Sequence, residues 1–321
     1  MKNNAIRVRD FAKEQAQIQW KPELVALLDS AEKNNEFVAI ESRTFGQEVW
    51  RKFKKNKLAL AGSIFLLVLT LFSILYPMIS SYTYDGIDLS AKNLSPSVAH
   101  WFGTDSLGRD LFIRILYGGR ISLTVGLVSA VINLLIGTLY GGISGFCGGR
   151  IDQIMMRVVD IIYSIPTLLY VLLITMVLGN NLYTVIIAIA ISSWAGMARI
   201  VRAQILSLKE QEFALAAISL GASKRRILIR HLLLNSIGPI IVTTTLNIPT
   251  AIFTEAFLSF IGCGIAIPQA SWGTLSSEAL QVSLVYPLQL FFPAAAICFT
   301  MFSLNFLGDG LNDAFDPHGN R

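Results

Sequence analysis

The sequence predicts an all-α polytopic membrane protein with six transmembrane helices. Of its 321 residues, 53% are hydrophobic and only 15% are charged. The mean hydropathy of +0.57 is likewise far from that of an ordinary soluble domain. Six apolar runs contain no charged residue, and each is close to or above the roughly 20 residues that a helix needs to cross ~30 Å of hydrocarbon. These runs cover residues 58–79, 121–146, 161–178, 182–198, 237–254 and 279–308.

The positions of Lys and Arg predict the orientation of these helices. With the N-terminus inside, 22 of the 26 Lys and Arg residues lie on the inner side, and only Lys92, Arg109, Arg114 and Arg120 lie outside. Such a bias is typical of cytoplasmic loops, so both termini are expected to be cytoplasmic. Orientation and attraction to anionic lipid account for the net charge of +5, and no nucleic-acid partner is expected.

The N-terminal residues 1–57 are expected to form a cytoplasmic tail. They are polar and mixed in charge, with an amphipathic candidate helix at residues 22–33 and a basic cluster just before the first apolar run. That run is too long for the core of a signal peptide, which predicts an uncleaved span. Residues 58–120 then hold this span and an extracytoplasmic loop.

Two long connections are predicted outside. Residues 80–120 are rich in Gly, Asp and Arg, and they predict a folded turn with a short interfacial helix. Residues 262–286 contain no Lys or Arg and a single acid, Glu278. The IPQASWG segment within this second connection predicts a re-entrant or capping loop.

The second apolar run contains Gly137, Gly141 and Gly145 at a spacing of four. Such a stripe of small residues allows another helix backbone to approach closely, so a packing face is predicted. The third and fourth runs are short and are expected to extend toward Asp160 and Arg199. Asp160 also lies three residues after Arg157, a spacing that predicts a local ion pair.

The fifth run has one polar stripe, formed by Thr243, Asn247, Thr250 and Thr254 at spacings of four, three and four. These weak hydrogen-bonding groups could line a passage for a solute, and polar contacts between helices are the alternative. Glu255 follows toward the outer end. It is a candidate functional residue because ionisable groups near the membrane core are costly, but it could instead reach water or an arginine of the first outside loop.

The basic loop at residues 202–236 predicts two short helices between membrane spans. Ser207 and Glu210 form an S-x-x-E capping box, an apolar face follows, and Gly221 is placed to end the first helix. Ser223 can cap a second helix through residue 235. The apolar face of the first helix comprises Phe213, Ala216, Ala217 and Leu220.

This second helix begins with Lys224, Arg225 and Arg226, the wrong charge for the positive end of a helix dipole. Something outside the helix must compensate for them. Anionic lipid would do so if the loop is only a connector. Docking into the groove of a soluble partner is the other interpretation, since it requires a short helix with small residues.

Enzymatic and ion-driven alternatives fit the sequence poorly. Asp160 and Asp309 could suggest an intramembrane aspartyl protease, whose two carboxylates share a proton, but they lie in V-D and L-G-D rather than in Y-D and G-x-G-D. No HExxH or G-x-S-x-G motif occurs. Secondary transporters generally have repeated halves and mid-span ionisable sites, and the six runs here show neither.

Within the basic loop, Leu215, Ala216 and Ala217 followed three residues later by Gly221 are similar to the E-A-A-x-x-x-G segment of ABC-importer permeases. Leu215 replaces the usual acid, which Glu212 could supply instead. Five further blocks and the one around this loop occur in order: GTDSLGRD (103–110), LYGGRISL (116–123), ARIVRAQILSLKEQEFALAAISLGAS (198–223), EAFLSFIGCG (255–264), SWGTL (271–275) and NFLGDGLNDAFDP (305–317). Together they resemble the oligopeptide, dipeptide and nickel importer permeases, specifically their C-type subunit.

The resemblance implies a type I ABC importer fold in a multi-pass bacterial or archaeal cell-membrane protein. Residues 121–309 would form the importer core and residues 310–321 a cytoplasmic tail. The implied partners are a homologous second permease, two cytoplasmic ATP-binding subunits and an extracytoplasmic substrate-binding protein. A coupling helix would dock the ATPases through Glu212, Phe213, Ala216, Ala217, Leu220, Gly221, Ser223, Lys224 and Arg225.

The resemblance leaves two substrate classes open, peptides and nickel. No G-x-x-x-x-G-K-[ST] phosphate loop occurs, so no ATPase activity and no cofactor of its own are expected; ATP and Mg would be used by the partner subunits. A path lined with Thr and Asn favours oligopeptides or dipeptides, because it offers no His, Cys or carboxylate cluster for a transition metal. A metal carried as a chelate would escape this argument.

Overall fold

The computed structural model describes residues 44–266 and 269–316. The amphipathic candidate at residues 22–33 lies outside the described part. The described helices belong to one compact unit, Phe45–Arg321, and in this part of the chain the only β-type pairing is an isolated bridge between Thr104 and Asp110. An all-α membrane architecture is therefore confirmed. The helices are α4 (Phe45–Lys55), α5 (Lys57–Ile79), a 3-10 turn (Leu89–Ala91), α6 (Leu111–Cys147), α7 (Gly149–Ser164), α8 (Thr167–Leu178), α9 (Leu182–Leu208), α10 (Glu212–Ser219), α11 (Lys224–Arg226), a π-helical segment (Ile227–Leu233), α12 (Ile237–Phe260), α13 (Trp272–Leu280) and α14 (Pro287–Phe315).

Five of these helices are long and apolar enough to span a membrane, namely α5, α6, α9, α12 and α14. The count reaches the predicted six if α7 and α8, which bend by 80° at a short break, are one span. The prediction of a single straight helix over the third run, 161–178, is therefore wrong. Ile165 is extended, with φ −90° and ψ 124°, because the ring of Pro166 disfavours helical geometry at the residue before it.

Two predicted helix ends are also wrong. α6 begins at Leu111 rather than at residue 121, because the Asp110 side chain accepts a hydrogen bond from the Ile113 amide and caps it. The last span begins at Pro287 rather than at residue 279. Residues 279 and 280 belong instead to α13.

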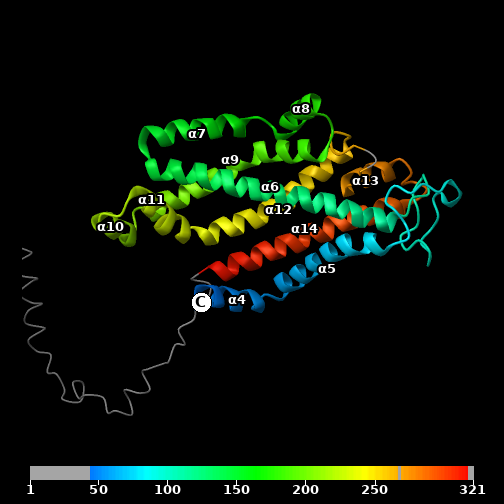
Figure 1. The fold of residues 1–321 in the computed structure, drawn as a ribbon, viewed down its shortest axis with the longest axis horizontal. Helices are drawn as coiled ribbons and strands as arrows, with labels where there is room; N and C mark the ends of the chain where they lie inside the picture. The colour runs from blue at the N-terminus through cyan, green and yellow to red at the C-terminus, as the bar shows by residue number, and fades with distance from the viewer. Residues whose placement is uncertain (1–43, 267–268, 317–321) are drawn as a thin grey trace, which may run out of the picture. The chain divides into compact units, whose positions relative to one another are not determined.

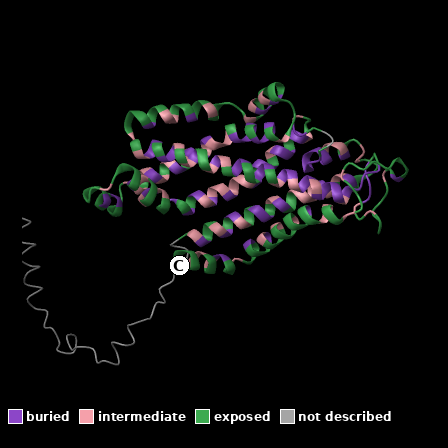
Figure 2. Ribbon diagram, viewed as in Figure 1, coloured by how far each residue is buried: buried purple, intermediate pink, exposed green. Residues whose placement is uncertain are grey.

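The packing centre of the bundle is formed by α6 and α9. α12 packs against α6 and α14, and α14 packs against α5. In Figure 2 the buried residues follow the inner faces of these helices, whereas α7 and the outer face of α5 are largely exposed. Val125, Ile189 and Leu258 lie in one buried apolar cluster from α6, α9 and α12.

The three glycines at a spacing of four all face α9. A Cβ atom placed on Gly137 would lie 2.6 Å from the side chain of Met197, and one on Gly141 would lie 2.2 Å from the carbonyl oxygen of Ala198. At Gly145 the same atom would lie 2.9 Å from the carbonyl oxygen of Arg202. Since two of these obstacles are backbone atoms, only glycine permits this helix separation at Gly141 and Gly145.

The bundle has two distinct ends, named here by the short helix at each. At the α10 end, α10 and α11 project beyond the long helices; at the opposite, α13 end, α13 lies beside the loop that joins α5 to α6 (Figure 1). These two ends and the α12 face between them contain the candidate functional residues.

Candidate functional site

The α10 hairpin begins later than its sequence predicts. α9 continues to Leu208, so Ser207 lies inside it, and α10 starts at Glu212 with Gln211 at its N-cap and no side-chain cap bond. The predicted Ser207 and Glu210 capping box is therefore wrong. The physical reason is packing: Ile205 is fully buried, and Leu208 packs against the same apolar cluster, which extends α9 by a turn.

The end of α10 and the start of the next helix agree with the prediction. Gly221 follows α10 with φ +77°, a left-handed conformation that glycine adopts without strain. The Ser223 hydroxyl accepts a hydrogen bond from the Arg226 amide at 3.4 Å. Beyond Arg226 the helix widens into a π segment, a form that occurs mostly in single turns.

The predicted apolar face of α10 is divided between two environments. Ala217 is 8% exposed and packs inward together with Ala214, so the prediction that it shares one apolar face with Phe213 and Leu220 is wrong. Outward, Phe213 is 39% and Leu220 87% exposed, and Glu212 and Ala216 are exposed as well. Leu215, the residue in place of the family's acid, is also exposed. Ser223, Lys224 and Arg225 are exposed beside them.

A groove of about 610 Å³ runs along α10. Its walls include Phe146 and Ile151 from α6 and α7, and Leu215 and Ile218 from α10. Lys209 lies in the same groove and donates to the carbonyl oxygen of Gly145 at 3.3 Å. The exposed apolar residues and the groove together form a surface that a folded partner can contact.

Close to the hairpin, an ion pair and a hydrogen bond to the same carboxylate join α6, α7 and α9. Arg202 of α9 donates to Asp152 of α7 at 2.5 Å, and the Ser144 hydroxyl of α6 donates to the same carboxylate at 2.6 Å. This junction links α7 to the end of α9 that leads into α10. Sequence analysis missed it, although an arginine and an aspartate at the edges of apolar runs were a usable signal.

Asp160 pairs with Arg199 of α9 at 2.7 Å. The predicted local pair with Arg157 is therefore wrong. α7 packs directly against α9, so a residue from the neighbouring helix comes closer than one on the next turn.

The polar stripe of α12 borders two cavities. Thr243 lines the larger one, about 930 Å³, which lies between α9, α12 and α14. Asn247, Thr250 and Thr254 line a smaller cavity of about 90 Å³. That smaller cavity also contains Asn133, Thr167, Ser192 and Ser193 from α6, α8 and α9, which sequence analysis missed although they are polar residues in or beside apolar runs.

Glu255 is fully buried toward the α13 end of α12. Its carboxylate accepts hydrogen bonds from the hydroxyls of Ser122 and Ser259, both at 2.8 Å. The alternatives that it reaches water or an arginine are therefore wrong. Ser122 also accepts from the Trp272 amide at 3.4 Å, so Glu255 is connected through Ser122 to the first turn of α13.

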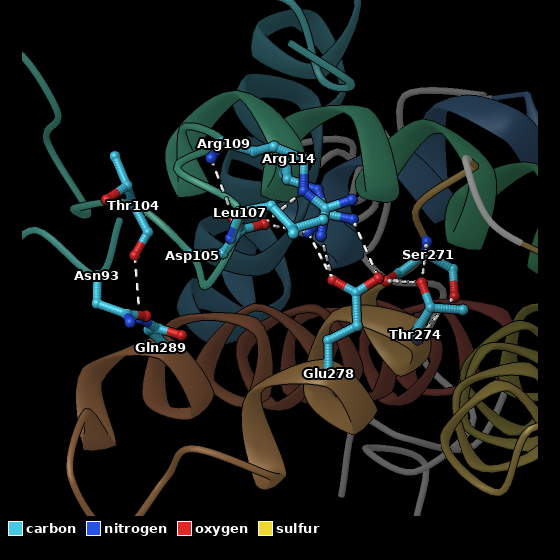
Figure 3. Close-up of polar contacts among 10 residues, drawn as sticks. All are labelled: Asn93, Thr104, Asp105, Leu107, Arg109, Arg114, Ser271, Thr274, Glu278 and Gln289. Carbon is cyan, nitrogen blue, oxygen red and sulfur yellow. Dashed lines mark hydrogen bonds and ion pairs between the residues drawn. The ribbon is translucent and has the colours of Figure 1, made fainter. Parts of the chain in front are cut away.

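The arginines of the first outside loop pair instead with Glu278 and Asp105 (Figure 3). Arg109 lies 2.6 Å from Asp105 and 2.8 Å from Glu278, and Arg114 lies 2.7 Å from each. The Arg114 side chain is 1% exposed. Two carboxylates therefore neutralise two guanidinium groups away from water, which a buried charge requires.

These contacts hold α13 against the rest of the bundle. Ser271 and Thr274 form a capping box at its start, and the fully buried Trp272 donates from Nε1 to the carbonyl oxygen of Ile115 at 2.9 Å. Gly273 lies so close to α12 that a Cβ atom there would be 2.2 Å from the Ala256 carbonyl oxygen. The predicted capping loop thus contains a helix that is docked firmly beside α6 and α12.

The described residues thus form a helical membrane bundle with a short hairpin projecting at one end and a docked helix at the other. Residues 137–320 match the family described as the binding-protein-dependent transport system inner membrane component, and residues 44–96 match the N-terminal TM domain of oligopeptide transport permease C. The chain belongs to the first of these families, the membrane-embedded permease components of ABC importers.

The similar proteins include named peptide permeases. The chain is 50% identical to the oligopeptide transport system permease protein OppC of Bacillus subtilis, over 88% of this chain and 92% of that protein. It is 48% identical to the dipeptide transport system permease protein DppC of the same organism, over 89% and 90%. The oligopeptide permease OppC of Escherichia coli K12 is 43% identical, over 90% and 96%.

A solved structure has the same fold. The inward-facing MetNI methionine ABC transporter aligns with a TM-score of 0.53 at 18% identity, covering 64% of this chain and 97% of that one. The type I importer fold expected from the sequence is thereby confirmed.

Proposed function

We propose that this chain is the transmembrane permease subunit of an ATP-driven importer that moves oligopeptides or dipeptides across the cell membrane. The observation that supports this most strongly is the identity of 50% and 48%, over about nine-tenths of the chain, to permeases named for oligopeptide and dipeptide transport. Its partners are a homologous second permease, two cytoplasmic ATPases that use ATP and Mg, and an extracytoplasmic substrate-binding protein.

The surface around α10 is the proposed docking site for the ATPase. Phe213, Ala216 and Leu220 project away from the bundle, Glu212 can supply the carboxylate that Leu215 does not, and Lys224 and Arg225 lie beside them. When ATP binding brings the ATPases together, α10 moves with them as a rigid lever. The ion pair between Arg202 and Asp152 passes this displacement from α9 to α7.

The proposed translocation path follows the polar face of α12. Thr243 borders the larger cavity and Asn247, Thr250 and Thr254 the smaller one, so the stripe connects two hollows along the bundle. Rocking of the helices against the second permease would expose this face first to one side of the membrane and then to the other. Neutral hydroxyl and amide groups hold a peptide weakly enough to release it.

The excess of Lys and Arg near the α10 end supports a cytoplasmic location for that end and for both termini. The α13 end then faces the substrate-binding protein. A nickel or metal-chelate importer is the second candidate because related sequence blocks serve both substrate classes. Among the described residues, no group of three or more His, Cys, Asp or Glu side chains is placed to hold a metal ion, which favours peptide.

Uptake measurements in a strain lacking the gene test the proposal. We expect the deletion to lose accumulation of a labelled oligopeptide and of a labelled dipeptide, or of one of them, and to keep accumulation of radioactive nickel. Restoring the gene should restore peptide uptake. Loss of nickel uptake with normal peptide uptake would contradict the proposal and establish the second candidate.

A further inference from the structure

The small cavity beside α12 is lined mainly by polar residues. It measures about 90 Å³ and is bordered by Asn133 of α6, Thr167 of α8, Ser192 of α9 and both Thr250 and Thr254 of α12. None of its lining residues carries a charge. Thr250 is exposed, so the cavity lies at the face of α12 that the rest of this chain leaves uncovered.

Asn133 has a buried acceptor with no partner. Its side chain is 2% exposed, its Nδ2 lies 2.8 Å from the Ser193 hydroxyl, and its Oδ1 is buried without a hydrogen bond. The Ser193 hydroxyl donates its only proton to the carbonyl oxygen of Ile189. Ser193 can therefore only accept from Asn133. Nδ2 is then the atom that faces Ser193, and Oδ1 is a buried acceptor without a partner on a residue that lines the cavity.

Three further hydroxyl groups of the cavity are acceptors for the same reason. Thr250 donates to the carbonyl oxygen of Leu246 at 3.4 Å, Thr254 to that of Thr250 at 2.8 Å, and Ser192 to that of Ile189 at 3.0 Å. Each proton is used within its own helix, so the remaining lone pairs can only accept. Together with Oδ1 of Asn133, they give the cavity several neutral acceptors. Asn247 and Thr167 also line it, and their side chains can donate as well as accept.

We propose that this cavity binds backbone N–H groups of the peptide in transit, with Asn133, Thr250 and Thr254 as the acceptors. The inference rests on the proposed function and specifies how the path recognises its substrate. A volume of about 90 Å³ equals the share of about three water molecules, which suits one peptide unit better than a large side chain. Recognition of the backbone alone is compatible with peptides of many sequences.

The ligand class follows from the chemistry of the lining. Ions are disfavoured because none of the lining residues carries a charge that could balance theirs. Transition metals prefer imidazole, thiolate or carboxylate ligands, and none of the lining residues has one. An uncharged N–H donor matches the acceptors, and it leaves readily because each hydrogen bond replaces a comparable one to water.

The test compares two probes in proteoliposomes that contain the whole importer and a saturating amount of its binding protein. One probe is labelled tri-alanine; the other is the depsipeptide in which an ester oxygen replaces the central N–H. The quantity measured is the ratio of their transport rates. The variants are Thr250→Val, which removes one acceptor at an exposed position, and Asn133→Leu, which removes the buried one.

Thr244→Val is the matched control, because Thr244 makes the same kind of bond, to the Ile240 carbonyl oxygen at 2.8 Å, and does not line the cavity. We expect wild type and Thr244→Val to favour tri-alanine equally, and each cavity variant to reduce that preference by about fivefold. The contribution of the binding protein is the same in all of them and cancels.

The outcomes separate the two proposals. If wild type moves neither probe, the proposed function is wrong. If wild type moves tri-alanine and Thr250→Val leaves the ratio unchanged, the function stands and the cavity does not recognise the backbone N–H. Because Asn133→Leu could impair folding, the Thr250→Val result decides the matter on its own.

Discussion

At the scale of single residues, two clusters of buried ionisable groups lie at the α13 end. Glu255 is satisfied by two serine hydroxyls, whereas Arg114 and Arg109 share two carboxylates. The charges in this second cluster balance, so removing one member leaves its partners buried and uncompensated. A buried ion pair adds little net stability, but breaking it is costly.

Arg114→Met is expected to lower the free energy of unfolding by about 3 kcal/mol. The substitution keeps the apolar stem and leaves Asp105 and Glu278 short of one cation. Thermal unfolding of the detergent-solubilised protein measures the effect. Lys92→Met, at an exposed position in the same loop, is the control and should leave the unfolding temperature unchanged; equal effects of the two substitutions would contradict the role assigned to the cluster.

At the scale of elements, the proposed role of α10 needs large side chains on its surface, whereas the contact between α6 and α9 needs glycines without side chains. α10 places large apolar residues outward, with Leu220 87% exposed, as a helix that docks onto a partner must. Ala217 packs inward, so replacing it would disturb the hairpin rather than the docking surface. The contact of α6 with α9, by contrast, depends on the absence of side chains at the glycines.

Leu220→Asp is expected to weaken binding of the ATPases by about tenfold or more, because it puts a charge at the centre of the proposed interface. The amount of ATPase that co-purifies with the permease measures this. Leu284→Asp, on a leucine that is 100% exposed in the connection between α13 and α14, is the matched control and should leave co-purification normal. Normal co-purification of Leu220→Asp would exclude α10 as the principal contact.

Gly141→Ala is expected to destabilise the bundle by about 1–3 kcal/mol, since its Cβ atom would lie 2.2 Å from a backbone oxygen of α9. The matched control is Gly196→Ala on α9, where a Cβ atom meets nothing within 4 Å. That substitution should be neutral or slightly stabilising, because alanine is the better helix former. Thermal unfolding in detergent distinguishes the two, and equal stability would exclude a tight α6–α9 contact at Gly141.

At the scale of the whole molecule, labelling of the native cysteines can test the orientation of the chain in the membrane. Cys147 is exposed at the α10 end, Cys263 is partly exposed between α12 and α13, and Cys298 lies within α14. With Cys298 replaced by Ala, a membrane-impermeant maleimide should label Cys263 in intact cells and Cys147 only after permeabilisation. Labelling of Cys147 alone in intact cells would reverse the proposed topology.

The sequence predicted the helical class and the existence of α10 well, but it predicted several helix ends poorly. Capping at Asp110 and the extended residue before Pro166 were local signals that could have been used. The extension of α9 past Ser207 could not be seen, because it depends on burial of Ile205 in a cluster that also contains Leu232. Pairing of Asp160 with Arg199 likewise depends on which helix lies next to α7.

Hydropathy by itself determined that this chain is an all-helical membrane protein, because in hydrocarbon each segment must satisfy its own backbone hydrogen bonds. The ordered blocks, including the one around Ala216 and Gly221, were enough to indicate the family. Only the tertiary structure decided that Ala217 faces inward, that Glu255 meets serines, and that Asn133 shares a cavity with Thr250. These facts concern residues far apart in the chain, and helix packing brings them together.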